Sequence, residues 1–185
     1  MKPLLVCLVV GLQSAWIAGT ALVQEHHLAN DPVVRLETRP VDPRDMLRGD
    51  YVILSYDISE LPLALFQPKP GNDPSSGETV FVVLRKEGEF HKPVRATLQQ
   101  PELQAGEVAI RGRANYTWRQ YDPTLKRHTN TVVRIQYGLE RYYVSEGNGN
   151  PRGKLTVDAT VSKDGRPILK QVYLDGRPYR EAMKP

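Results

Sequence analysis

The chain has 185 residues, of which 40% are hydrophobic, and a formal net charge of +4. A chain of this length can bury a sizeable core, so the classes of small protein that depend on disulfides or metals to fold are excluded. The charges of both signs are interspersed, with no basic stripe of the kind that binds nucleic acid, and we expect no nucleic-acid partner.

The first element is an apolar segment at the N-terminus. Residues 4–23 contain no charged side chain, and as a helix they would span about 30 Å, the thickness of the bilayer core. We therefore predict that residues 1–23 form a membrane anchor that contacts the lipid bilayer through residues 4–23. The alternative is a secretory signal peptide with Lys2 as its charged region and small residues at 19–21 for cleavage. Cleavage would release a secreted protein.

The charges that flank the anchor indicate its orientation. Lys2 lies on one side, whereas on the other side Glu25 comes first and no Lys or Arg occurs before Arg35. Because Lys and Arg favour the cytoplasmic side, we predict a single pass with a cytoplasmic N-terminus. Residues 24–32 would then be a linker, and residues 33–185 a domain outside the cytoplasm.

Alternation of apolar and polar residues predicts β-strands in the rest of the chain. The Asp-Gly pair at 164–165 favours a hairpin near the C-terminus. No window after residue 23 shows convincing helical periodicity, and 15 prolines and 14 glycines interrupt the chain. We therefore predict one mainly antiparallel β domain, a barrel or a sandwich. The predicted strands are 51–58, 79–85, 89–98, 107–113, 131–143, 154–161 and 167–174, and the predicted loops are 67–78, 119–130 and 145–152.

One motif defines a family resemblance. Residues 49–56 follow the pattern Gly-Asp-Tyr-x-x-Leu-x-Tyr, and Pro-Val-Asp-Pro-Arg-Asp precedes them at 40–45. Two further patches, at 133–147 and 153–176, follow in the same order. Together with the apolar N-terminus, they make the chain resemble the bacterial GDYXXLXY family of membrane-anchored proteins. The resemblance implies a retained anchor and a multi-spanning membrane-protein partner, since members are often encoded beside such proteins, but it implies no reaction.

The motif residues have structural interpretations. Gly49 suits a turn into the following strand, and Asp50 suits a cap of that turn. Tyr56 shares a face with Val52 and Leu54, so we expect its ring in the core and its hydroxyl hydrogen-bonded.

Two polar clusters are candidate binding residues. Arginine forks pair with carboxylates or phosphates, and tyrosines supply flat faces, so the two clusters would form a groove if the strands bring them together. Such a groove would bind a membrane-protein partner or an envelope ligand. The alternative is that the charges pair with each other at a loop crossing. The first cluster is Arg44, Asp45, Arg48, Asp50 and Tyr51, and the second is Glu140, Arg141 and Tyr142.

A catalytic alternative uses the carboxylates. Asp50 with Glu140 or Glu146 would serve as an acid–base pair in a hydrolase acting on a cell-envelope polymer. Nothing in the sequence sets their separation, so we favour binding over catalysis and expect no cofactor. We also expect no metal site, because the four histidines lack ligand spacing.

Overall fold

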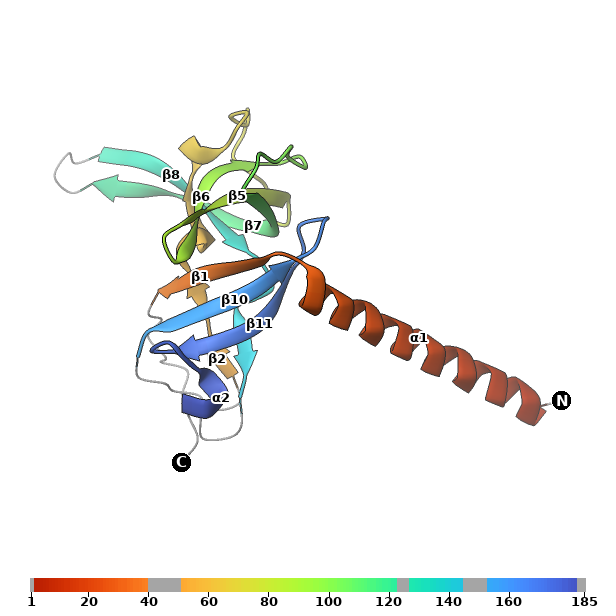
Figure 1. Ribbon diagram of the computed structural model, residues 1–185. Helices are drawn as coiled ribbons and strands as arrows, with labels where there is room; N and C mark the ends of the chain where they lie inside the picture. The colour runs from red at the N-terminus through yellow and green to blue at the C-terminus, as the bar shows by residue number, and fades with distance from the viewer. Residues whose placement is uncertain (1, 40–50, 123–126, 145–152, 183–185) are drawn as a thin grey trace. The chain divides into compact units, whose positions relative to one another are not determined.

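The computed structural model describes residues 2–39, 51–122, 127–144 and 153–182 (Figure 1). The chain divides into two compact units, Met1–Asp31 and Pro32–Pro185. The first unit is helical and the second is mainly β with antiparallel sheets, which confirms the predicted fold class.

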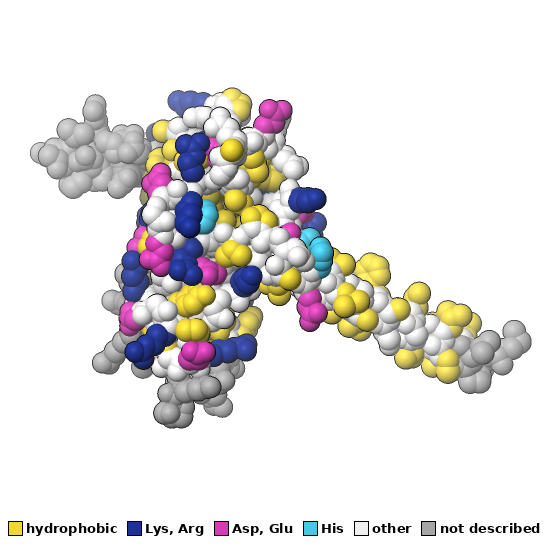
Figure 2. All heavy atoms as spheres, viewed as in Figure 1, with side chains coloured by type: hydrophobic (Ala, Val, Ile, Leu, Met, Phe, Trp, Pro, Cys, Tyr) yellow, Lys and Arg dark blue, Asp and Glu magenta, His cyan; other side chains and the backbone are white. Residues whose placement is uncertain are grey.

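Helix α1 spans Lys2–Asn30, and its apolar side chains are exposed (Figure 2). Trp16, for example, is 75% exposed. The stretch Leu5–Asn30 is long and apolar enough to cross a membrane, a test that a signal sequence also passes. The helix continues through residues 24–30, so most of the segment expected to link the anchor to the domain is helical.

Two five-stranded sheets and one two-stranded ribbon make up the described part of the β domain. The first sheet has the order β12-β11-β10-β1-β3, and the second has the order β4-β8-β7-β5-β6. The antiparallel sheets include a half-barrel. Figure 1 shows β5, β6, β7 and β8 on one side of β1, and β10 and β11 on the other. The first sheet comprises β1 (Val33–Arg39), β3 (Ser55–Tyr56), β10 (Leu155–Val161), β11 (Pro167–Leu174) and β12 (Arg177–Pro178). The second comprises β4 (Glu60–Pro62), β5 (Thr79–Glu87), β6 (Phe90–Thr97), β7 (Glu107–Asp122) and β8 (Arg127–Gln136).

Short elements complete the domain. The ribbon pairs β2 (Tyr51–Ile53) with β9 (Arg141–Tyr143). Single turns of 3₁₀-helix, η1 (Asp57–Ser59) and η2 (Leu63–Leu65), flank β4, and a four-residue helix, α2 (Tyr179–Ala182), follows β12.

Several strand boundaries differ from the sequence prediction. The strand predicted at 131–143 is divided into β8 and β9 by a turn at Gly138, whose φ of 82° favours glycine. The predicted loop 119–130 is mostly strand, because β7 and β8 extend into it. β1 was not predicted, although Val34 and Leu36 alternate with polar residues and are buried.

Residues from both sheets fill the core, and in β5 and β10 consecutive residues are buried. Each aliphatic side chain removed from water stabilises the fold by roughly 1.5–3 kcal/mol before entropy is counted. The buried tyrosines of the described core are Tyr56, Tyr137 and Tyr179. The completely buried aliphatic residues are Val34, Val80, Val82, Val83, Leu84, Ala96, Ile110, Val133, Ile135, Val157, Ala159 and Val172.

The two sheets meet where β1 contacts β6, a line that we term the seam. Among the described strands, no backbone ladder joins β1 to β6. Instead, the Arg35 backbone N–H donates to Nδ1 of His91 at 3.0 Å, and Lys92 Nζ lies 2.9 Å from a carboxylate oxygen of Glu37. Pro93, also in β6, has no N–H to donate. Side chains therefore replace main-chain pairing at the seam.

His91 makes the seam sensitive to pH. Burial lowers the pKa of His91 below its ordinary value of 6.5, and Nδ1 accepts the Arg35 N–H only while it is unprotonated. Since the unfolded chain binds this proton more readily, the free energy of unfolding should fall as the pH drops below about 6.5. His91→Asn retains an acceptor but cannot titrate. We expect its urea midpoint to depend less on pH than that of the wild type between about pH 7 and pH 5.

The other three histidines are present in both proteins, so the difference between the two pH profiles isolates His91. Parallel profiles would show that protonation of His91 is not linked to unfolding.

Candidate functional site

The ribbon brings the motif beside the second polar cluster. Tyr51 pairs with Tyr143, Val52 with Tyr142 and Ile53 with Arg141. These partners are about 90 residues apart in the chain, as the numbering shows, so the sheet topology juxtaposes them. Of the first predicted cluster, the backbone of Tyr51 therefore lies in the same ribbon as Arg141 and Tyr142 of the second.

Not every predicted site residue is described. Arg44, Asp45, Arg48, Asp50 and Glu146 lie outside the described residues, as does Gly49. Tyr51 is described only through its place in the ribbon. Of the predicted residues, the structure therefore places the side chains of Glu140, Arg141 and Tyr142.

The hydroxyls of Tyr56 and Tyr137 each donate a hydrogen bond to a main-chain carbonyl far away in the sequence, an arrangement that we term the tyrosine clasp. The Tyr56 hydroxyl donates to the Leu139 carbonyl at 2.6 Å, and the Tyr137 hydroxyl donates to the Ile58 carbonyl at 2.6 Å. Tyr56 is 0% exposed and Tyr137 is 6% exposed. The last tyrosine of the motif thus joins β3 to the turn between β8 and β9, as its apolar phase and its need for a partner predicted.

Burial dominates the acidity of both tyrosines. It raises the pKa of Tyr56 far above its ordinary value, with Glu140 adding to the effect. Burial and Glu140 likewise raise the pKa of Tyr137. Both hydroxyls therefore stay protonated, and remain donors, across the physiological pH range.

Glu140 closes the turn that the clasp holds. Its two carboxylate oxygens accept the backbone N–H groups of Tyr137, at 2.6 Å, and Gly138, at 2.9 Å. Its own carbonyl accepts the N–H of Leu54 at 2.8 Å, next to the ribbon. Glu140 thus connects the motif strand to the turn through both its side chain and its backbone.

The ribbon has an inner face and an outer face. Val52 is buried, and the ring of Tyr142 packs edge-on against Tyr179, with centroids 5.4 Å apart. On the outer face, Ile53 is 43% exposed and Tyr143 is 70% exposed, and Arg141 is exposed as well. We term the side chains of Ile53, Arg141 and Tyr143 the ribbon patch.

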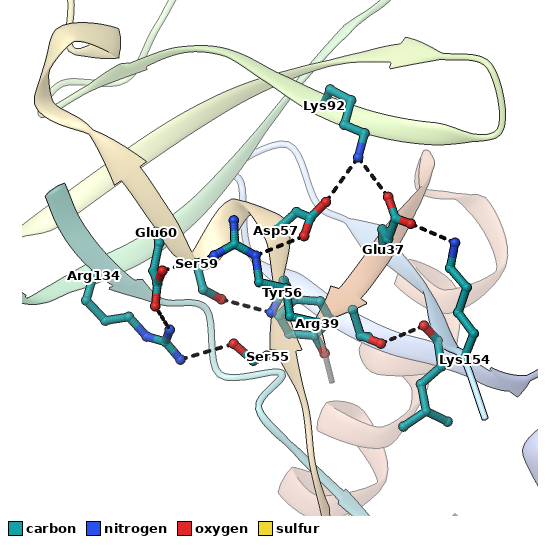
Figure 3. A network of polar contacts seen from close by, with 12 residues as sticks. Glu37, Arg39, Ser55, Tyr56, Asp57, Ser59, Glu60, Lys92, Arg134 and Lys154 are labelled. Atoms are coloured by element: carbon teal, nitrogen blue, oxygen red, sulfur yellow. Dashed lines mark hydrogen bonds and ion pairs between the residues drawn. The ribbon is translucent and has the colours of Figure 1, made fainter. Parts of the chain in front are cut away.

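A continuous chain of ion pairs, the ion-pair network, lies beside the clasp (Figure 3). Successive nitrogen–oxygen distances run from 2.6 to 3.1 Å. Its members come from both five-stranded sheets, from η1 and, for Lys154, from the residue before β10, so it ties the sheets together. In order along the network they are Lys154, Glu37, Lys92, Asp57, Arg39, Glu60 and Arg134.

Cations neutralise the carboxylates of this network. Lys154 and Lys92 hold the pKa of Glu37 at about 2, and Glu37 in turn raises the pKa of Lys92. Arg134 also contacts the Ser55 hydroxyl at 3.3 Å, which extends the network toward the motif. In the part of the chain that the structure describes, no group of three or more His, Cys, Asp or Glu side chains is arranged to hold a metal ion.

These observations define a class of protein: a mainly β domain that follows a helix able to span a membrane, with a tyrosine-containing motif built into the fold. Residues 13–172 match the family described as GDYXXLXY protein. The chain therefore belongs to the GDYXXLXY family, a family of unknown function, as the motif resemblance predicted. No curated protein matches the chain, and no solved structure does.

Sequence reasoning missed most of the polar contacts. The sequence analysis singled out none of Tyr137, Lys92 and Arg39. The only sequence signal for Tyr137 was the adjacent Gly138, which is typical of a turn.

The clasp should contribute measurably to stability. Tyr56→Phe leaves the ring in place but leaves the buried Leu139 carbonyl without its donor, so we expect the free energy of unfolding to fall by about 1–3 kcal/mol. Tyr137→Phe should have a similar effect through Ile58. Chemical denaturation of both variants measures the change. Tyr116→Phe, at a residue that is 55% exposed, is the control and should change stability by less than about 0.5 kcal/mol. Equal losses in all three variants would contradict a specific role for the clasp.

Glu37 should stabilise the domain above the acid range. With a folded pKa of about 2 against an ordinary value of 4.5, its contribution is present above pH 4.5 and is lost as the pH falls toward 2. Because Glu37 is 25% exposed, we expect Glu37→Gln to cost about 1 kcal/mol near neutral pH.

The Glu37→Gln variant and the wild type should converge in stability toward about pH 2 and in high salt, since both conditions weaken the ion pairs. Denaturation as a function of pH measures this. Glu87→Gln, at an exposed residue in β5, is the matched control. A constant difference at all pH values would show that lost packing, not charge, causes the destabilisation.

Proposed function

We propose that this chain is a single-pass membrane protein whose β domain lies outside the cytoplasm and binds a membrane-protein partner through the ribbon patch. The exposure of Ile53 and Tyr143 on the motif-containing ribbon carries the proposal. In the register of the ribbon, Tyr143 opposes Tyr51, two positions from Ile53, so the two exposed side chains are diagonal neighbours.

The composition of the ribbon patch suits recognition of a protein. Tyrosine and arginine are enriched where protein interfaces bury their central contacts, and they contribute much of the binding energy there. The Tyr142–Tyr179 contact and Val52 support the inner face of the ribbon, which limits the side-chain and backbone entropy that binding would cost.

The described carboxylates favour binding over hydrolysis. A general acid needs a raised pKa, whereas cations lower the pKa of Glu37 and Glu107, and hydrogen bonding to Ser162 lowers that of Asp164. Both oxygens of Glu140 accept backbone N–H groups of its own turn. These arrangements give Glu37, Glu107, Glu140 and Asp164 structural roles, whereas Asp50 and Glu146 lie outside the described residues. The ribbon patch is therefore the surface on which the proposal rests.

Retention of α1 as an anchor is part of the proposal. A helix that is apolar on all sides needs either a protein core or a lipid environment, and the side chains of α1 are exposed from Leu5 to His26. The asymmetry of flanking charge, with Lys2 on one side and Glu25 on the other, supports a cytoplasmic N-terminus.

Site-specific photo-crosslinking tests the surface. A benzoylphenylalanine residue would replace Ile53, Tyr143 or, as the control on the second sheet, Tyr116 in the full-length protein in its native membranes. We expect positions 53 and 143 to cross-link to the same integral membrane protein, and position 116 to give little of that product. The intact mass of the purified protein shows whether the N-terminal helix is retained.

Absence of a product at 53 and 143, or an equal yield at 116, would contradict the ribbon patch as the binding surface. A product that is a soluble protein would contradict the class of partner. A mass that lacks the N-terminal segment would contradict the anchor.

A further inference from the structure

Strands β7 and β8 present an outer face that carries two aromatic rings. The residues that alternate with this face point into the core and are at most 2% exposed: Ala114, Val133 and Ile135. Beyond Ala114, a bulge brings Tyr116 to the outer side, where it pairs with Arg134. Glu60 of β4 pairs with Arg134 from the other side. We term the following side chains the aromatic face: Glu60, Arg113, Tyr116, Trp118, Arg134 and Gln136.

Tyr116 and Trp118 form the centre of the aromatic face. They are two residues apart in β7, and their ring centroids lie 5.4 Å apart with an angle of 38° between the ring planes. Tyr116 is 55% exposed and Trp118 is half-buried. Two rings held side by side on a strand give a ligand two neighbouring surfaces on which to stack. Binding to them costs little conformational entropy, because each side chain has few rotatable bonds.

Polar groups with fixed positions lie beside the rings. The Arg134 guanidinium donates to Glu60 at 2.7 Å and to the Ser55 hydroxyl at 3.3 Å (Figure 3). The second carboxylate oxygen of Glu60 accepts a hydrogen bond from Arg39 at 3.0 Å. These bonds hold a planar donor and a planar acceptor next to Tyr116 before any ligand arrives.

Arg113 and Gln136 form the next row of the aromatic face. They pair across the strands, about 7 Å along β8 from Arg134, and both are exposed. Arg134 and Glu60 neutralise each other. Arg113 is therefore the cation of this face that has no ion-pair partner among the described residues. The face thus combines stacking surfaces, hydrogen-bonding groups of both kinds and one free positive charge.

A sugar chain matches this combination better than other ligands do. A pyranose ring carries C–H groups on its faces and hydroxyls around its edge, so it can stack on an aromatic ring while its hydroxyls bond to Arg and Glu side chains. An apolar ligand would remove Arg134 and Gln136 from water without replacing the lost hydrogen bonds. A single-stranded nucleic acid also stacks on aromatic rings, but it needs a track of cations for its phosphates, which Arg113 alone does not supply.

From these observations we propose that the aromatic face binds a segment of a polysaccharide whose sugars carry carboxylates. Two neighbouring sugar rings stack on Trp118 and Tyr116, their hydroxyls bond to Arg134 and Glu60, and a carboxylate pairs with Arg113. The proposal depends neither on the ribbon patch nor on retention of α1, since the aromatic face shares no residue with either.

Tryptophan fluorescence tests this site directly. The chain has two tryptophans, Trp16 in α1 and Trp118, so Trp16→Phe leaves Trp118 as the only one. The full-length Trp16→Phe protein would be purified in lauryldimethylamine oxide, a detergent without a sugar headgroup. It would be titrated with tetragalacturonate, with neutral cellotetraose or with oligothymidylate. We expect tetragalacturonate to change the Trp118 emission saturably, and cellotetraose to bind roughly twofold to fivefold more weakly.

Variants separate the parts of the aromatic face. Tyr116→Ala removes one stacking surface and should weaken tetragalacturonate binding by roughly threefold to tenfold. Trp118→Ala should do the same, as measured by calorimetry because the fluorophore is lost. Arg113→Gln should lower the affinity for tetragalacturonate to that for cellotetraose. Leu103→Ala, at an exposed apolar residue between β6 and β7, is the matched control and should leave the affinity unchanged.

Each part of the proposal has an outcome that would overturn it. No saturable change with either saccharide would overturn sugar binding. Undiminished affinity in Tyr116→Ala and Trp118→Ala, each shown to be folded by circular dichroism, would overturn the location. Equal affinities of the Trp16→Phe protein for the two saccharides would overturn the preference for carboxylates. Tighter binding of oligothymidylate than of either saccharide would overturn the class of ligand.

Discussion

The hydrogen bond from the Tyr56 hydroxyl to the Leu139 carbonyl is the contact on which the arrangement of the motif depends. A carbonyl buried at a turn is costly unless a donor reaches it. Here the turn lies between β8 and β9, and the donor, Tyr56, comes from β3 in the first sheet. The Tyr137 hydroxyl donates to the Ile58 carbonyl, and the Glu140 carboxylate accepts two backbone N–H groups of the same turn. The placement of β9, and hence of the ribbon patch, follows from that turn.

The ion-pair network and the seam join the sheets by a different physical means. The clasp works in the core, where burial keeps both hydroxyls protonated. The network lies partly exposed, with Lys92 contacting both Glu37 and Asp57, so its contribution depends on salt and on acid. The contribution of the tyrosine clasp is thus insensitive to salt and to moderate changes of pH, whereas that of the ion-pair network falls in high salt and in acid.

The sequence predicted the elements better than their connections. Period-2 alternation identified β6, β10 and β11, because one buried face imposes that pattern. β5 was identified by a continuous apolar run, which is typical of a strand buried on both faces. It could not show that the alternation from 131 to 143 is interrupted, since Gly138 and Glu140 fit an outward-facing strand as well as a turn. The groove between the two polar clusters stays a prediction, because Arg44, Asp45, Arg48 and Asp50 lie outside the described residues. The structure pairs the backbone of Val52 with that of Tyr142. The ion pairs were beyond prediction, because they join residues such as Arg35 and Asp158 that only the tertiary fold brings together.

The seam also bears on how this domain behaves when many copies of the chain lie close together. Strands that border an open half-barrel offer unpaired backbone groups to a neighbouring chain, the usual route to edge-to-edge aggregation. In β6, Pro93 lacks a donor, while His91 and Lys92 engage β1 with their side chains. A second copy would have to displace these contacts before it could add a strand there. The same polar side chains that close the fold therefore protect it against self-association along this edge.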